Sequence, residues 1–139
     1  MLTPPNIIYF FICCFFLILF AQSAIDKIQN KKENLDWLNS HFKSSILVQY
    51  VSLLFTILTI LEFICAFFFF VNIINICIDI GFVDYDPMLA FYISMLTFLS
   101  LFFGQRLARD YEGAKTIAIY FTLNIIAFIF VLEYVVCYS

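Results

Sequence analysis

The chain has 139 residues, of which 65% are hydrophobic and only 12% are charged, and its formal net charge is −3. Soluble globular domains contain about half apolar and about a quarter charged residues, so this composition is typical of a membrane protein. Too few residues remain outside the apolar runs to build a soluble catalytic domain. A negative chain without a basic face also excludes nucleic acid as a partner.

Four apolar runs are long enough to cross a bilayer, whose hydrocarbon core of about 30 Å takes about 20 helical residues. The predicted fold class is all-α: a single-domain, polytopic four-helix transmembrane bundle over residues 1–139. AQSA at 21–24 imitates a signal-peptide cleavage site, but no basic residue precedes the first run, so we expect a permanent span. The expected spans are at about 7–24, 46–74, 88–106 and 114–136.

Every basic side chain falls in one of two gaps, the gap after the first span and the gap between the third and fourth. Short loops rich in Lys and Arg stay in the cytoplasm, so we expect both termini outside and these two loops inside. The bias toward Phe, Ile and Asn is typical of an AT-rich bacterial genome, which predicts a bacterial inner (cytoplasmic) membrane protein. The basic residues are Lys27, Lys31, Lys32, Lys43, Arg106, Arg109 and Lys115.

The loop between the first two spans has a helical pattern of its own, with hydrophobic residues at 28, 35, 38, 42 and 46. We expect a short cytoplasmic interfacial helix over 34–43, anchored in the membrane surface by Trp37. A plain solvated loop is the alternative, because ten residues are marginal for a helix.

The second apolar run extends from Ser45 to about Ile78 and is too long for one perpendicular helix. It must therefore tilt, project beyond the bilayer, or break near Asn72 and Asn75.

Small and weakly polar residues mark the faces on which membrane helices pack, and here they recur every three or four positions. A compact left-handed bundle follows from these faces. The expected contact residues are Gln49, Ser52, Thr56, Thr59, Glu62 and Ala66 in the second span, Ala90, Ser94, Thr97, Gly104 and Ala108 in the third, and Ala114, Ala118 and Thr122 in the fourth.

Four pieces of the chain carry a resemblance: QSAIDKI at 22–28, NLDWLNSHFKSS at 34–45, the LE pair at 61–62 and FGQRLARDYEGA at 103–114. They resemble the DoxX-like family of small bacterial membrane proteins, in the variant common in Bacteroidetes. The resemblance implies a four-helix membrane bundle named after a subunit linked to thiosulfate:quinone oxidoreduction, although most members have no assigned activity. Family members often carry Gly where this chain has Phe67 to Phe70, which disfavours a site that needs close approach along that helix.

The intramembrane polar candidates are Glu62, Asn124 and Thr97. A carboxylate inside the membrane costs about 2.5 kcal/mol or more on insertion scales, so Glu62 is a functional candidate. It could serve a quinol or a proton path. It could instead be a neutral side chain that hydrogen-bonds Asn124 or Thr97 and holds helices together. We favour the structural interpretation, because no second intramembrane ionisable group is expected to continue a proton relay.

A second group of polar residues is expected at the cytoplasmic ends of the spans, where it could form a linked set of ion pairs. Arg106 and Lys27 could hold an anion or a quinone carbonyl, but interfacial anchoring and locking of the loops is the favoured role. The group comprises Gln22, Asp26, Lys27, Gln105, Arg106, Arg109, Asp110 and Tyr111.

Of the five cysteines, Cys77 and Cys137 are expected near the outer face, where a disulfide is possible. No metal site is expected, because the single His41 has no Cys or His partner.

The sequence contains no complete catalytic set, so whether the protein is an enzyme stays open. The favoured function is a small non-catalytic subunit of a larger membrane complex, in contact with lipid and with other membrane subunits. The alternative is a quinone-linked redox subunit, with quinone as the only cofactor considered. A small-molecule carrier ranks last, because no internal repeat is visible.

Overall fold

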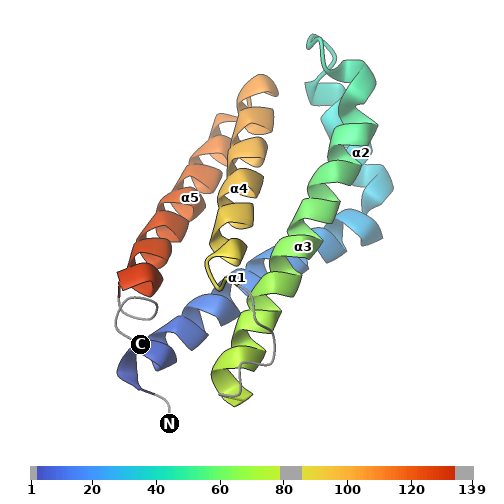
Figure 1. Cartoon of the computed structure of the whole chain (residues 1–139). Coiled ribbons are helices and arrows are strands. Elements are labelled where there is room, and N and C mark those ends of the chain that lie inside the picture. Colours follow the sequence, from blue (N-terminus) through green and yellow to red (C-terminus); the bar gives the residue numbers. More distant parts are fainter. Residues whose placement is uncertain (1–2, 79–85, 134–139) are drawn as a thin grey trace.

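The computed structural model describes residues 3–78 and 86–133, and this part of the chain is helical with no strand. The predicted all-α fold is confirmed (Figure 1). Four of the helices are long and apolar enough to cross a membrane, so the chain is a multi-pass integral membrane protein. The helices are α1 (Pro4–Gln29), α2 (Lys31–His41), α3 (Val51–Ile78), α4 (Leu89–Leu107) and α5 (Tyr111–Val131), with a 3-10 turn at Val48–Tyr50 before α3.

The second span is one continuous helix, so the break considered near Asn72 and Asn75 does not occur. Asparagine weakens a helix mainly by offering the backbone other hydrogen bonds. In the structure the side-chain amide of Asn72 instead donates to the carbonyl oxygen of Pro87 at 3.2 Å, across the gap to the segment before α4. The helix is therefore long, and tilt or projection accommodates its length.

The segment after the first span is the helix α2, so the alternative of a plain loop is wrong. The helix begins at Lys31, three residues earlier than expected, directly after Asn30 ends α1. Its apolar side, with Leu35 and Leu38, packs against a small cluster formed by Phe42, Val51 and Ala108. This contact with α3 and the end of α4 stabilises a helix too short to persist alone.

The four spans are arranged as two helix pairs. α1 packs along α3 and α4 packs along α5, while contacts between α3 and α4 join the pairs. α1 and α5 touch only sparingly, which leaves one side of the bundle less closely packed. The helix α2 and the turn between α4 and α5 lie away from the start of α1, toward the other end of the bundle (Figure 1).

The centre of the bundle is aromatic. The rings of Phe16 and Phe69 stack with centroids 5.1 Å apart, and those of Phe20 and Phe98 are 5.0 Å apart. Within the Phe67 to Phe70 run, Phe69 is fully buried while Phe67 and Phe70 are exposed, so this run faces both the core and the outside of the bundle.

The contact faces predicted from small residues are right for most of α4, for the middle of α3 and for the start of α5, and wrong elsewhere. Thr59, Glu62 and Ala66 of α3, Ala90, Ser94, Thr97 and Ala108 of α4, and Ala114 of α5 are buried. Small residues mark a contact only on the side of a helix that meets a neighbour, and at the start of α3 that side is formed by Val51 and Phe55. The predicted contact residues that are exposed are Gln49, Ser52, Thr56, Ala118 and Thr122.

Gly104 and Thr122 of α5 are two further small residues that do not mark a contact between helices. A β-carbon on Gly104 would meet nothing within 4 Å, so this glycine is not a point of close helix approach. In α5 the buried side is formed by Ala114, Asn124, Ala127 and Val131. The exposed Thr122 satisfies its hydroxyl on its own helix, at the carbonyl of Ala118 (2.9 Å).

Candidate functional site

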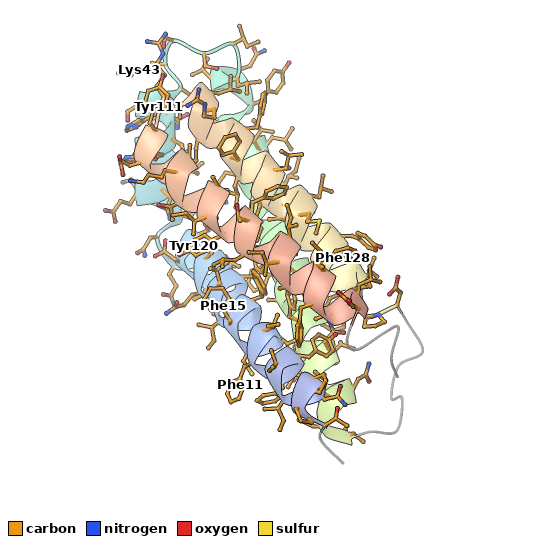
Figure 2. The ribbon with its side chains drawn as sticks, turned by 90° about the vertical axis from the view of Figure 1, so that its left-hand side faces the viewer. Phe11, Phe15, Lys43, Tyr111, Tyr120 and Phe128 are labelled. Atoms are coloured by element: carbon orange, nitrogen blue, oxygen red, sulfur yellow. The ribbon has the colours of Figure 1, made fainter. Side chains whose placement is uncertain are left out.

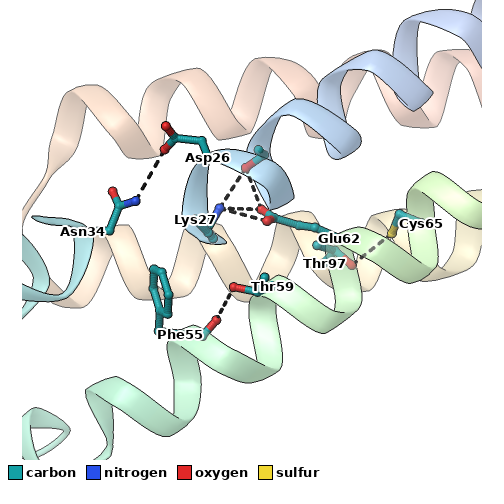
Figure 3. Close-up of polar contacts among 9 residues, drawn as sticks. Asp26, Lys27, Asn34, Phe55, Thr59, Glu62, Cys65 and Thr97 are labelled. Carbon is teal, nitrogen blue, oxygen red and sulfur yellow. Dashed lines mark hydrogen bonds and ion pairs between the residues drawn. The ribbon is translucent and has the colours of Figure 1, made fainter. Parts of the chain in front are cut away.

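An ion pair joins α1 to α3 inside the bundle (Figure 3). Lys27 Nζ lies 2.8 Å from Oε1 and 2.9 Å from Oε2 of Glu62, whose side chain is only 1% exposed. Ser23 Oγ donates to Oε1 at 2.9 Å and accepts from Lys27 Nζ at 2.8 Å. The carboxylate therefore receives its counter-charge and its hydrogen bonds from the last two turns of α1.

This geometry corrects the expected surroundings of Glu62. Its side chain bonds neither Asn124 nor Thr97, and a second ionisable group, Lys27, is present beside it. Lysines at helix ends usually extend outward toward water, which is why the sequence placed Lys27 in the cytoplasmic cluster. In the structure its flexible stem turns inward and its side chain is 18% exposed.

Ser23 is the functional neighbour that sequence reasoning missed. The signal for it is the spacing of Phe16, Phe20, Ser23 and Lys27, which recur at four, three and four positions and so share one face of a helix. Because Phe16 and Phe20 are buried in the core, Ser23 and Lys27 one and two turns later are directed the same way.

Thr97 and Asn124 are buried and each connects two spans. Cys65 Sγ of α3 and Thr97 Oγ1 of α4 are 3.3 Å apart, and Ser94 Oγ of α4 donates to Asn124 Oδ1 of α5 at 3.0 Å. These two contacts and the Lys27–Ser23–Glu62 group are polar contacts between spans. Together they link α1 to α3, α3 to α4, and α4 to α5.

The group expected at the cytoplasmic ends of the spans is separated in the structure into local contacts. Asp26 accepts hydrogen bonds from the amides of Asn30 (2.6 Å) and Asn34 (3.4 Å), which brace the bend between α1 and α2. The side chain of Lys27 points into the bundle and pairs with Glu62 instead of joining this group. The only other ion pair recorded among residues 3–78 and 86–133 is the exposed Lys115–Glu112 contact at 3.9 Å. The expected linked set of ion pairs is therefore wrong.

The remaining members of that group shape the turn between α4 and α5. Asp110 caps α5 by accepting from the backbone N–H of Gly113 at 3.0 Å, and the guanidinium of Arg106 lies 4.9 Å from the centre of the Tyr111 ring. Arg109 has a left-handed backbone with φ 57°, and Gln105 lies beside Gly113. These residues lock the turn, as the favoured interpretation expects, and Gln22 lies apart from them on α1.

A cleft of about 380 Å³ lies beside the ion pair and is lined by residues of all four spans. Its polar lining comes from Gln22, Ser23, Glu62 and Tyr120, and Phe20 and Phe98 supply further aromatic rings. The volume falls in the range of small-molecule sites, about 300–1,000 Å³. The arrangement can hold a small amphipathic molecule next to a neutralised carboxylate.

The cysteines offer no assembled redox or metal site in the part of the chain described. Cys13 and Cys65 are buried, and Cys77 is an exposed free thiol near the end of α3. Cys137 lies outside the described residues, so the Cys77–Cys137 disulfide stays a prediction. No group of three metal-ligating side chains occurs within 3–78 and 86–133.

Comparison of the chain with protein-family models, with curated proteins and with solved structures found no match. The fold and the site therefore define a class, a four-span membrane protein with a buried ion pair. The resemblance to the DoxX-like family stays a prediction.

Proposed function

We propose that this protein is a small non-catalytic subunit of a larger membrane complex, of the DoxX-like type. We place it in a bacterial inner membrane with both termini outside. The proposal rests on the observation that the intramembrane polar residues form contacts between spans. Glu62, Thr97 and Asn124 all have partners on a neighbouring span. Polar side chains in membrane interiors commonly hold helices together in this way, and such a role requires no turnover.

The outer surface of the spans supports the same proposal. Large aromatic side chains project from α1, α3 and α4, where they can contact lipid or the spans of another subunit. Packing between membrane helices depends on close van der Waals contact, and broad Phe side chains supply contact area. The most exposed phenylalanines among them are Phe11 (65%), Phe103 (61%), Phe67 (60%), Phe70 (49%) and Phe15 (46%).

Purification from native membranes tests the subunit proposal. The tagged chain, expressed at its natural level and extracted in polymer discs with its surrounding lipid, should co-purify with a membrane protein in fixed stoichiometry. The paired changes Phe67→Leu/Phe70→Leu on α3 and Phe11→Leu/Phe15→Leu on α1 identify the docking side, and one pair should reduce recovery of the partner. Recovery of this chain alone, in discs that retain known complexes of the same membrane, would refute the proposal.

The cleft beside Glu62 favours a second candidate, a quinone-linked redox subunit. Phe20 and Phe98 line the cleft but are each only 1% exposed, so a planar ring would contact mainly the half-buried Tyr120 there. The variant Glu62→Gln separates the two candidates: normal assembly with loss of quinone-linked turnover in the host complex would favour the redox role. The carrier hypothesis loses support, because membrane carriers commonly use broken spans at their binding sites and α3 is continuous.

A further inference from the structure

We infer that the outer side of α1 binds α1 of a second copy of this chain, with the Gln22 side chains of the two copies hydrogen-bonded to each other. Such a dimer is independent of the subunit proposal, because the chain can dimerise whether or not it also joins a larger complex. It is supported by the position of Gln22, by its lack of a partner among the described residues, and by the way in which two copies are inserted in one membrane.

One side of α1 is a stripe of exposed, mainly apolar residues. Its members are spaced alternately three and four positions apart, so they lie on one side of the helix, and this is the spacing of residues along which two helices pack. Figure 2 shows two of them, Phe11 and Phe15, on the outer side of α1. The stripe comprises Ile8, Phe11, Phe15, Ile18, Gln22 and Ile25.

Gln22 is the polar member of this stripe and belongs to the apolar part of the span. The first charged residue of α1, Asp26, comes one turn later. The neighbouring Ser23 points into the bundle and bonds Glu62, but the Gln22 side chain is exposed and hydrogen-bonds no other residue in the part of the chain that the structure describes. A polar group without a partner at this depth is unfavourable, because lipid tails cannot hydrogen-bond it.

Exposed polar residues on other spans do not have this requirement. The hydroxyl of Thr56 on α3 donates to the carbonyl of Ser52 at 2.9 Å, and that of Thr122 on α5 donates to the carbonyl of Ala118 at 2.9 Å. Both threonines are therefore satisfied within their own helices and can face lipid. Gln22 distinguishes the outer side of α1 from the equally apolar outer sides of α3 and α5.

A second copy supplies the matching group at the matching depth. Every copy is inserted with the same orientation, so the α1 helices of two copies related by a two-fold axis along the membrane normal run parallel. Gln22 of one copy then meets the same residue of the other. A carboxamide both donates and accepts, so the two side chains can form reciprocal hydrogen bonds. Polar residues at such positions fix the register of parallel coiled coils, and they also join membrane helices.

Energy transfer between labelled copies tests the dimer. The purified full chain carries a donor or an acceptor dye on a carboxyl-terminal tag, and the two forms are reconstituted together in phosphatidylcholine liposomes. Transfer should exceed that of random encounter and fall reversibly as lipid is added. Gln22→Leu should raise the dissociation constant about tenfold, the equivalent of about 1.4 kcal/mol and the scale of hydrogen bonds between membrane helices.

Two matched variants accompany Gln22→Leu. Gln22→Asn keeps the amide and should retain most of the association. Gln49→Leu removes an exposed glutamine just before α3 and should behave like wild type. Transfer by the wild-type chain no greater than random encounter, or equal dissociation constants for wild type and Gln22→Leu, would overturn the inference.

Cross-linking locates the contact. A two-fold contact places each residue near the axis beside its own copy, so a single cysteine there can link two chains. In a background with all five native cysteines replaced, oxidation with copper phenanthroline should link Phe15→Cys and Ile18→Cys into dimers. The controls Ile60→Cys on α3 and Ile126→Cys on α5, at positions 53% and 59% exposed, should stay monomeric. Preferential linkage at 60 or 126 would place the contact on another side and refute the assignment.

The two proposals fail separately. Both dimer experiments use this chain without any other protein subunit, so a monomeric result there would leave the subunit proposal standing. Failure to recover a different subunit from native membranes would likewise leave the dimer standing.

Discussion

At the scale of single residues, the ion pair between Lys27 and Glu62 joins two side chains with different access to water. Glu62 is 1% exposed and cannot reach water, whereas Lys27 is 18% exposed and has a flexible stem. The two residues therefore differ in how they would respond to the loss of the partner. Removing Lys27 leaves a buried carboxylate without its counter-charge, while removing Glu62 leaves a lysine that can turn outward to water.

A double-mutant cycle tests this asymmetry. Lys27→Met should lower the free energy of unfolding by about 3 kcal/mol, because it leaves the buried carboxylate without its counter-charge. Glu62→Leu should cost about 1 kcal/mol, because Lys27 can extend toward the interface. The double variant should lie within about 1 kcal/mol of wild type, since an apolar pair can replace a buried ion pair. Unfolding of the purified protein in mixed micelles by titration with SDS measures all three.

Lys115→Met serves as the control for this cycle. Lys115 pairs with Glu112 at 3.9 Å in a fully accessible position, and exposed pairs contribute little. Its unfolding curve should coincide with that of wild type. Additive effects of Lys27→Met and Glu62→Leu would show that the two side chains are not coupled.

At the scale of the helices, the Ser94–Asn124 contact holds α4 to α5. Asn124 is fully buried, accepts from Ser94 at 3.0 Å and donates to the carbonyl of Phe91 at 3.3 Å. Asn124→Leu should lower the free energy of unfolding by about 1 kcal/mol, the scale of an intramembrane hydrogen bond between helices. Thr122→Val, on the same helix but exposed, should have almost no effect. Equal losses in the two variants, by the same SDS titration, would argue against the Ser94–Asn124 contact.

The turn between α4 and α5 gives a second test at this scale, because Gly113 is closely surrounded and Gly104 is not. A β-carbon at 113 would collide with the carboxylate of Asp110 and lie 2.8 Å from the side chain of Gln105. Asp110 would have to move, and its cap on the Gly113 N–H would be lost, so Gly113→Ala should destabilise the protein by about 1 kcal/mol. Gly104→Ala should be neutral or stabilising by up to about 1 kcal/mol, because alanine favours the helix.

Thermal unfolding in detergent, followed by circular dichroism, compares the two glycine variants. A lower midpoint for Gly113→Ala together with an unchanged or higher midpoint for Gly104→Ala is the expected result. The opposite order would mean that the geometry assigned to the turn is wrong.

For the whole molecule, the basic segments gather at one end of the bundle. Lys43, which follows α2, and Tyr111, at the start of α5, lie together at that end, away from Phe11 near the start of α1 (Figure 2). If that end faces the cytoplasm, as the distribution of Lys and Arg predicts, the Lys27–Glu62 pair lies in the cytoplasmic half of the membrane.

Cysteine accessibility tests this orientation. In a background with all five native cysteines replaced, a cysteine at position 32 and one at position 85 should react with membrane-impermeant maleimide from opposite sides. A cysteine at position 115 should behave like the one at 32. Reaction of positions 32 and 85 from the same side would refute the four-span topology.

The sequence by itself determined the helical class and the four spans, because membrane insertion is governed by the length of apolar runs along the chain. Residue periodicity indicated the helix α2 but left a plain loop as an alternative. These are local quantities. The orientation of Phe67 to Phe70 toward both the core and the outside is equally local, since four consecutive residues cover all sides of a helix.

Only the tertiary structure decided which polar residues meet. The sequence placed Lys27 with the residues at the ends of the spans and Glu62 with Asn124 or Thr97. The position of a residue along its own helix gives its depth in the membrane, but it does not give its partner on another helix. The actual pairing depends on how far α1 runs beside α3, on the rotamer of a long flexible lysine and on the small contact between α1 and α5 that leaves the cleft. None of these is a property of one helix, because each arises from the packing of side chains on different spans against one another.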